Sequence, residues 1–161
     1  MSVPTVPISD PRCVHQTLVA IEWISRHCGE VLHLQVEAEP RPESLRAAIR
    51  GKHAMLYKGK LYDAFLSEAV RQLAAQRPNE PLNGDLIGVA EIISTKPKTT
   101  KRARPKGDVD NLVKGVLDAL TQSRCIVDDD NLMSLVIGKR WALPEEKAGV
   151  RVCIGRLDPP E

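Results

Sequence analysis

Charged residues of both signs are concentrated between Ser94 and Leu132. The segment STKPKTTKRARPK carries no acid and six cations, which are Lys96, Lys98, Lys101, Arg102, Arg104 and Lys106. Aspartates follow in two groups, first Asp108 and Asp110 and then, about one helix length later, Asp128, Asp129 and Asp130. Like charges at close range repel one another unless they are widely spaced, solvated or neutralised by a counter-ion. The spacing therefore suggests a cation site beside a surface for a polyanion.

Clustered carboxylates are suited to a hard cation. Mg²⁺ takes oxygen ligands and usually employs only a few protein carboxylates together with substrate phosphate. If the backbone is extended, Asp108 and Asp110 project to the same side. An antiparallel return of the chain would then bring Asp128 and Asp129 to the same end of the intervening helix. A metal held in this way can activate water and stabilise a leaving oxygen, so the pattern indicates phosphoryl-transfer chemistry.

Lys114 and the basic segment would supply the remaining parts of such a reaction. Lys114 lies four residues from both Asp110 and Asp118, within side-chain reach of each on a helix. Its ammonium group could neutralise transition-state charge or protonate the leaving oxygen. The six cations would neutralise a nucleic-acid backbone, whereas an aromatic content of 3% does not favour base stacking. Together these features indicate a nuclease that acts on duplex DNA.

Simpler interpretations remain open on spacing alone. The basic segment could be a solvated loop, Asp110 a helix N-cap, and residues 128–131 an ordinary polar turn. A DNA-binding module without cleavage, or a metal-dependent phosphatase of small substrates, would use the same residue types. An EF-hand is excluded, because neither acidic group has the required glycine and later glutamate.

The length and composition are those of one soluble domain. With 161 residues, 42% hydrophobic and 27% charged, the chain can form one core and has no apolar run long enough to cross a bilayer. The N-terminal sequence MSVPTVPISDPR does not resemble a secretion signal, so we expect a cytoplasmic protein. The scattered cysteines fit a reducing compartment, and the residues Cys13, His15, His27 and Cys28 lack the usual spacing of zinc ligands.

Hydrophobic periodicity predicts the elements that would position these residues. Asp10 and Pro11 resemble a helix start, and apolar residues at helical spacing predict a helix over 11–28, with a strand as the competing interpretation. Two further helices are expected, one over 61–77 with the apolar stripe Leu61, Phe65, Ala69 and Leu73, and one that begins with Asp110 as its N-cap.

Alternating or continuous apolar residues predict the strands. They are expected over residues 31–39, 84–94, 125–130, 132–142 and 148–157, the last two joined by a turn, while residues 44–50 are expected to form a loop or short helix. This order of elements predicts an α+β fold of a single domain, in which helices pack on a mixed β-sheet.

The acidic stretch resembles the signature of a known family. GDVDNLVKGVLDALTQ followed by IVDDDNL resembles the D-x-D-N-x-x-K-x-x-x-D-A-L motif and later Asp-Asp pair of the RusA-type Holliday-junction resolvases. MLYKGKLYDAFLSEAVRQLAAQ is similar to the family's first helix. Weaker similarity extends from Val31 to Leu157, so residues 31–157 would form the RusA-like endonuclease domain and residues 1–30 an N-terminal extension.

The resemblance implies a function and a set of site residues. It implies a homodimeric endonuclease, dependent on Mg²⁺ with Mn²⁺ able to substitute, that resolves branched double-stranded DNA by paired nicks. Matched by motif, Asp108, Asp110 and Asp129 would bind the metal and Lys114 would be the catalytic lysine. Asp118 matches a helix acid of more structural character, and Asp128 is a weaker ligand candidate.

Two departures from the family pattern bear on DNA contact. Gly107 stands where relatives often have arginine, so Lys106 or Arg104 would take over the phosphate contact. The segment EPRPESLRAAIR differs from the family's proline-rich loop. These departures leave a DNA-binding module of the same fold, without resolvase activity, as the alternative.

Overall fold

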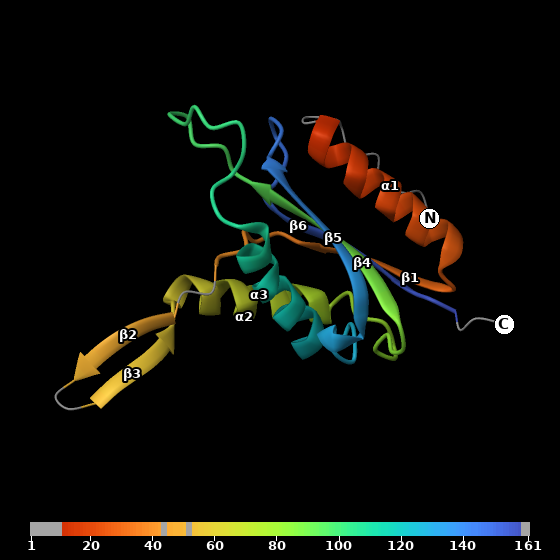
Figure 1. Cartoon of the computed structure of the whole chain (residues 1–161), viewed down its shortest axis with the longest axis horizontal. Helices are drawn as coiled ribbons and strands as arrows, with labels where there is room; N and C mark the ends of the chain where they lie inside the picture. Colours follow the sequence, from red (N-terminus) through yellow and green to blue (C-terminus); the bar gives the residue numbers. More distant parts are fainter. Residues whose placement is uncertain (1–10, 43–44, 51–52, 159–161) are drawn as a thin grey trace.

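Strand β4 (Leu86–Ser94) lies at the centre of the molecule because its sequence LIGVAEIIS is apolar on both faces. The computed structural model describes residues 11–42, 45–50 and 53–158 (Figure 1). Within these residues a four-stranded sheet has the order β1-β6-β4-β5, with β1 (Glu30–Val36), β5 (Leu132–Trp141) and β6 (Gly149–Arg156). Continuous burial along β4 follows from its place between β6 and β5.

The sheet is mixed, and the direction of each strand sets where the charged segments lie. β6 pairs antiparallel with both β1 and β4, whereas β4 and β5 are parallel. Parallel strands need a crossover, and α3 (Val109–Gln122) supplies it between β4 and β5. The basic segment therefore leaves the carboxyl end of β4 and enters the start of α3.

Helices cover both faces of the sheet (Figure 1). α2 (Lys60–Ala74) and α3 pack together on one face, where they bury a continuous core. That core includes Leu34, Phe65, Leu73, Ala90, Val116, Leu120, Val152 and Ile154. On the other face α1 (Pro11–His27) packs Ile24 against Val89 and Cys153. The predicted α+β fold with helices on a mixed sheet is confirmed.

The helical interpretation of the N-terminal segment is correct. α1 is helical from Pro11 to His27, close to the predicted range of 11–28, although Asp10 lies outside the described residues. Its apolar residues recur on the side that faces the sheet, and burial on that face offsets the poor helix propensity of its β-branched residues. The competing strand interpretation is therefore wrong.

Three local predictions are corrected. Residues 45–50 form strand β2 (Leu45–Arg50), which pairs with β3 (His53–Lys58) in a hairpin that projects from the sheet (Figure 1). The segment 125–130 contains only an isolated bridge between Leu82 and Ile126. Leu61 is 66% exposed, and Tyr62 takes its place in the buried stripe of α2. β5 and β6 are joined by a turn as expected, and β4 lies between them in the sheet.

Candidate active site and basic loop

The first acidic pair lies at the start of α3. Asp108 is the N-cap residue in an extended conformation (φ −78°, ψ 137°), and its side chain makes no capping hydrogen bond. Asp110 lies within the first turn of the helix, so the N-cap interpretation of Asp110 and the expected extended Asp108–Asp110 segment are both wrong. Both residues are exposed at the positive end of the helix dipole, which favours carboxylates there. A capping hydrogen bond therefore does not explain why either residue is an aspartate.

The second acidic group forms a short 3₁₀ turn, η1 (Asp129–Asn131). Asp128 is its N-cap, and Oδ1 of Asp128 accepts a hydrogen bond from the backbone N–H of Asp130 at 2.9 Å. Desolvation raises the pKa of Asp129, and the neighbouring carboxyl of Asp128 and the charge of Asp118 raise it further. Asp128 thus stabilises the turn, while Asp129 lies among carboxyl groups whose repulsion a cation would relieve.

Asp118 is held by a buried tyrosine. The hydroxyl of Tyr62, on α2, donates a hydrogen bond to Oδ2 of Asp118, and the Tyr62 side chain is fully buried. Asp118 therefore links α3 to α2, which agrees with a structural part for this acid. Sequence reasoning missed Tyr62, although its place one residue after Leu61 put it beside the expected stripe.

The two acidic groups do not converge within one chain. In the crossover from β4 to β5, α3 runs opposite to the parallel strands, so Asp108 lies near their carboxyl ends while Asp129 precedes the start of β5. Asp129 lies near Asp118. Asp118 is itself roughly 12 Å from Asp110 along the helix axis. Over residues 11–158, gaps excepted, no three acidic, histidine or cysteine side chains form a metal-binding group. The expected convergence at one helix end is not observed.

The donor types nevertheless suit magnesium. Asp108, Asp110 and Asp129 are exposed carboxylates, and hard oxygen donors of this kind are the ligands that Mg²⁺ prefers. Lys114 is exposed on α3, one turn after Asp110 and one turn before Asp118. The chemistry of the donor set fits the ion, but the geometry of a single chain does not assemble the three carboxylates.

The basic segment forms a loop over residues 95–107, hereafter the basic loop. All six of its predicted DNA-binding cations are exposed: Lys96, Lys98, Lys101, Arg102, Arg104 and Lys106. Two side chains of β5 hold its backbone. The indole Nε1 of Trp141 donates to the carbonyl oxygen of Arg102 at 3.0 Å, and Nζ of Lys139 donates to the carbonyl oxygen of Gly107. Sequence reasoning placed both residues on a strand but gave them no part in the site.

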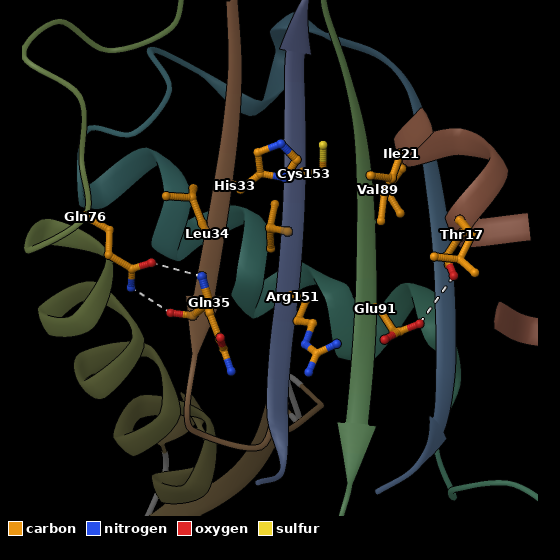
Figure 2. Close-up of a pocket in the computed structure, with 12 residues that line it drawn as sticks. Thr17, Ile21, His33, Leu34, Gln35, Gln76, Val89, Glu91, Arg151 and Cys153 are labelled. Atoms are coloured by element: carbon orange, nitrogen blue, oxygen red, sulfur yellow. Dashed lines mark hydrogen bonds between the residues drawn. The ribbon is translucent and has the colours of Figure 1, made fainter. Parts of the chain in front are cut away.

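A separate cavity lies on the opposite face of the sheet, beside α1 (Figure 2). Its volume is about 280 Å³, and its walls include Thr17, His33, Glu91 and Arg151. In Figure 2 the Thr17 hydroxyl donates to the Glu91 carboxylate at 3.3 Å. None of the predicted site residues lines this cavity, so it is distinct from the acidic and basic groups described above.

Exposed carboxylates directly follow a loop that is rich in cations and has no acid. This arrangement is suited to cleavage of a nucleic-acid backbone, so it indicates that the protein is a nuclease. A family model described as endodeoxyribonuclease RusA matches residues 37–154. The chain belongs to this family, and membership implies an endonuclease that resolves Holliday junctions. A comparison with curated proteins gives no significant match.

The family match leaves α1 and β1 outside its limits. It begins immediately after β1 and ends within β6, so it contains the basic loop, α3 and η1. No described helix combines the length and the hydropathy needed to cross a membrane.

Proposed function

We propose that this protein is a Mg²⁺-dependent, structure-selective endonuclease that resolves Holliday junctions by paired nicking, acting as a homodimer. The observation that carries the proposal is the direct succession of the basic loop and the start of α3. Six exposed cations lead without an intervening acid to Asp108 and Asp110. The loop would hold DNA phosphates next to the carboxylates that take part in the cleavage.

The basic loop would bind the DNA backbone rather than the bases. Its cations are exposed, and contacts of this kind supply affinity that is independent of sequence. That affinity weakens at higher salt, because the release of condensed counter-ions from DNA is then less favourable. Gly107, which replaces the arginine of many relatives, has φ +104°, a conformation that side-chain-bearing residues rarely adopt. The local backbone thus gives a reason for glycine, and Lys106 is the adjacent cation available for phosphate contact.

The proposed chemistry divides its tasks among four residues. Asp108, Asp110 and Asp129 would hold Mg²⁺, which when bound polarises the scissile phosphate and stabilises its developing negative charge. Lys114 would lie beside the same phosphate, where its ammonium group can stabilise charge on the non-bridging oxygens or give a proton to the leaving 3′ or 5′ oxygen. Asp118 and Asp128 would support this arrangement through their bonds to Tyr62 and Asp130.

The separation of the acids in one chain supports a dimer. Asp108 and Asp110 lie at the start of α3, whereas Asp129 lies beside Asp118 further along the helix. A two-fold arrangement that places η1 of one copy against the start of α3 of another would complete two equivalent sites at once. Two sites related in this way also match the approximate two-fold symmetry of a four-way junction, which must be cut on two strands.

A mixing experiment tests both the acids and the dimer. Asp110→Asn and Asp129→Asn proteins are each expected to be inactive. After unfolding and refolding together, half of the dimers would be mixed, and each mixed dimer would have one intact site, so nicking should return to about a quarter of the wild-type level. Nicks are counted on denaturing gels with a labelled four-way junction. Absence of any recovery, with subunit exchange verified by two affinity tags, would overturn the shared site.

The alternative is a DNA-binding module of the same fold without cleavage. The departures at Gly107 and in residues 39–50 favour it. It predicts salt-sensitive junction binding by the wild-type protein and no nicks at any Mg²⁺ or Mn²⁺ concentration. Measurement of binding and nicking on the same junction separates the two functions.

A further inference from the structure

Two side chains of β5 point toward the basic loop from neighbouring positions on one face of the strand. Trp141 and Lys139 are two residues apart and therefore lie on the same side of the sheet. Trp141 Nε1 donates to the Arg102 carbonyl oxygen at 3.0 Å, near the middle of the loop. Lys139 Nζ donates to the carbonyl oxygen of Gly107, its last residue. Each side chain thus bonds to the loop backbone rather than to a loop side chain.

Few other hydrogen bonds hold the basic loop, although the Arg102 N–H also donates to Thr100 Oγ1 at 3.3 Å and Pro105 is buried. Its first residue, Thr95, donates its backbone N–H to Glu39, and a local turn joins Thr100 N–H to the Pro97 carbonyl at 3.2 Å. A cavity of about 690 Å³ separates Ala103 from the turn between β5 and β6, which includes Leu143. Because side chains do not fill the space beneath the loop, the two hydrogen bonds from β5 have a large effect on its position.

Lys139 acts at the junction between the loop and α3. Gly107 precedes the N-cap Asp108, and the backbone at Gly107 has a positive φ of 104°. A Cβ atom at Gly107 would lie 3.3 Å from a methyl carbon of Leu112, so this corner of the chain is closely packed. A bond to the Gly107 carbonyl therefore fixes the direction in which the chain enters the helix that carries Asp108 and Asp110.

We propose that Trp141 and Lys139 are positioning residues with separate tasks, Trp141 for the DNA-holding part of the basic loop and Lys139 for the first two acids. This inference rests on the proposed endonuclease function for its kinetic consequences, but not for its structural ones. The bonds link the strand to the loop whether or not the protein cuts DNA. The structural consequences and the kinetic consequences can therefore be tested independently.

Limited trypsin digestion tests the structural level without DNA. Trypsin can cut the loop after Lys98, Lys101, Arg102 and Lys106, because the bonds after Lys96 and Arg104 precede proline. Trp141→Phe, which keeps an aromatic ring but loses the N–H donor, should accelerate cutting after Lys101 and Arg102 several-fold. Lys139→Met should accelerate cutting after Lys106, whereas Lys139→Arg should restore protection. Sites are identified by mass spectrometry.

Matched control variants exclude a general loss of stability. Trp23→Phe changes the other tryptophan, which is 45% exposed on α1, and Lys147→Met removes a lysine whose side chain is 72% exposed. Neither should alter loop digestion. Loop cutting in Trp141→Phe and Lys139→Met that equals the wild-type rate would overturn the inference, as would equal acceleration at all sites in the two control variants.

Junction kinetics separate positioning from simple structural support. Trp141→Phe should raise KM for a four-way junction about three- to tenfold with kcat nearly unchanged, as expected for loss of one hydrogen bond that orders the binding loop. Lys139→Met should instead lower kcat by about ten- to a hundredfold at nearly unchanged KM, because small displacements of reacting groups are costly. Equal effects of both variants on KM and kcat would contradict the division of tasks.

Tryptophan fluorescence tests the part played by Trp141 without a Trp141 variant, so the test does not depend on whether such a variant folds. In Trp23→Phe protein, Trp141 is the sole tryptophan. Its emission should shift when the protein binds a four-way junction in the presence of EDTA, because the loop that it contacts is then covered by DNA. Unchanged emission at saturating junction, with binding shown by gel mobility, would overturn the assignment of Trp141. A wild-type protein that binds but never cuts would instead contradict only the proposed function.

Discussion

Arg140 and Glu146 form a bidentate ion pair on the face of the sheet that α1 covers. Nη1 and Nη2 of Arg140 lie 2.7 Å from Oε2 and Oε1 of Glu146, and the Arg140 side chain is only 1% exposed. Nη2 also lies 3.2 Å from Oε1 of Glu91, whose other oxygen accepts the hydroxyl of Thr17 from α1. Arg140 thus connects β5 to β4, α1 and the turn before β6. The stability of this scaffold should depend on the guanidinium group.

Replacement of Arg140 by methionine should strongly destabilise the fold. The variant keeps much of the side-chain volume but leaves the buried Glu91 without its cation and Glu146 with only Arg151, 3.4 Å away. Loss of one partner costs about 3–5 kcal/mol in comparable buried pairs. Urea unfolding gives the free-energy change. Arg26→Met, which removes an ion pair whose arginine is 71% exposed, should change stability by no more than about 0.5 kcal/mol. Equal small effects would show that the Arg140 network adds little.

The same network should make stability depend on acid pH. Hydrogen bonding to Arg140 lowers the pKa of Glu146 below its ordinary value of 4.5, despite some desolvation. A lowered folded-state pKa stabilises the fold above the unfolded-state pKa, and this contribution is lost as pH falls through the folded value. The stability advantage of wild type over Glu146→Gln should therefore be largest near neutral pH and shrink below about pH 4.5. Unfolding series from pH 7 to pH 3 test this, and a constant difference would contradict it.

Alanine at Gly107 should impair cleavage more than it impairs folding. Gly107 and Gly84 both have positive φ, +104° and +92°, so alanine should cost about 1–2 kcal/mol at Gly84 and somewhat more at Gly107, where a Cβ would also lie 3.3 Å from Leu112. Only Gly107 borders the acidic start of α3. Junction cleavage should therefore fall at least about tenfold in Gly107→Ala and stay close to wild type in Gly84→Ala. A similar loss in both variants would mean that stability alone explains the effect.

Much of the scaffold was predictable because its signals are local. The apolar run of β4, the helical spacing in α3 and the Asp10-Pro11 start before α1 each depend on neighbouring residues. The hairpin of β2 and β3 was not predicted, because residues 45–50 have no alternation of apolar and polar side chains and their strand conformation depends on pairing with residues 53–58. Tyr62 rather than Leu61 lies in the core, and spacing alone does not choose between them, because the residues three and four positions before Phe65 both lie near its face of the helix.

The arrangement of the acids was mispredicted for a topological reason. The sequence order of strand, helix and strand at 84–141 is that of a parallel crossover, which places the start of α3 and the turn before β5 at opposite ends of the sheet. An antiparallel return was assumed instead, and it would have brought Asp108 and Asp129 together. The contacts of Lys139 and Trp141 with the basic loop depend on the same crossover and could not be inferred from their spacing alone.

Cleavage of a synthetic four-way junction by wild type and Asp110→Asn, with Mg²⁺ or with EDTA, tests the central claim most directly. Asp130→Asn serves as the matched control, because Asp130 is an exposed acid with no proposed part in metal binding. We predict paired nicks by wild type and Asp130→Asn only with Mg²⁺, and a loss of about a hundredfold or more in Asp110→Asn with junction binding retained. Cutting by wild type in EDTA, or undiminished cutting by Asp110→Asn, would contradict the proposed function.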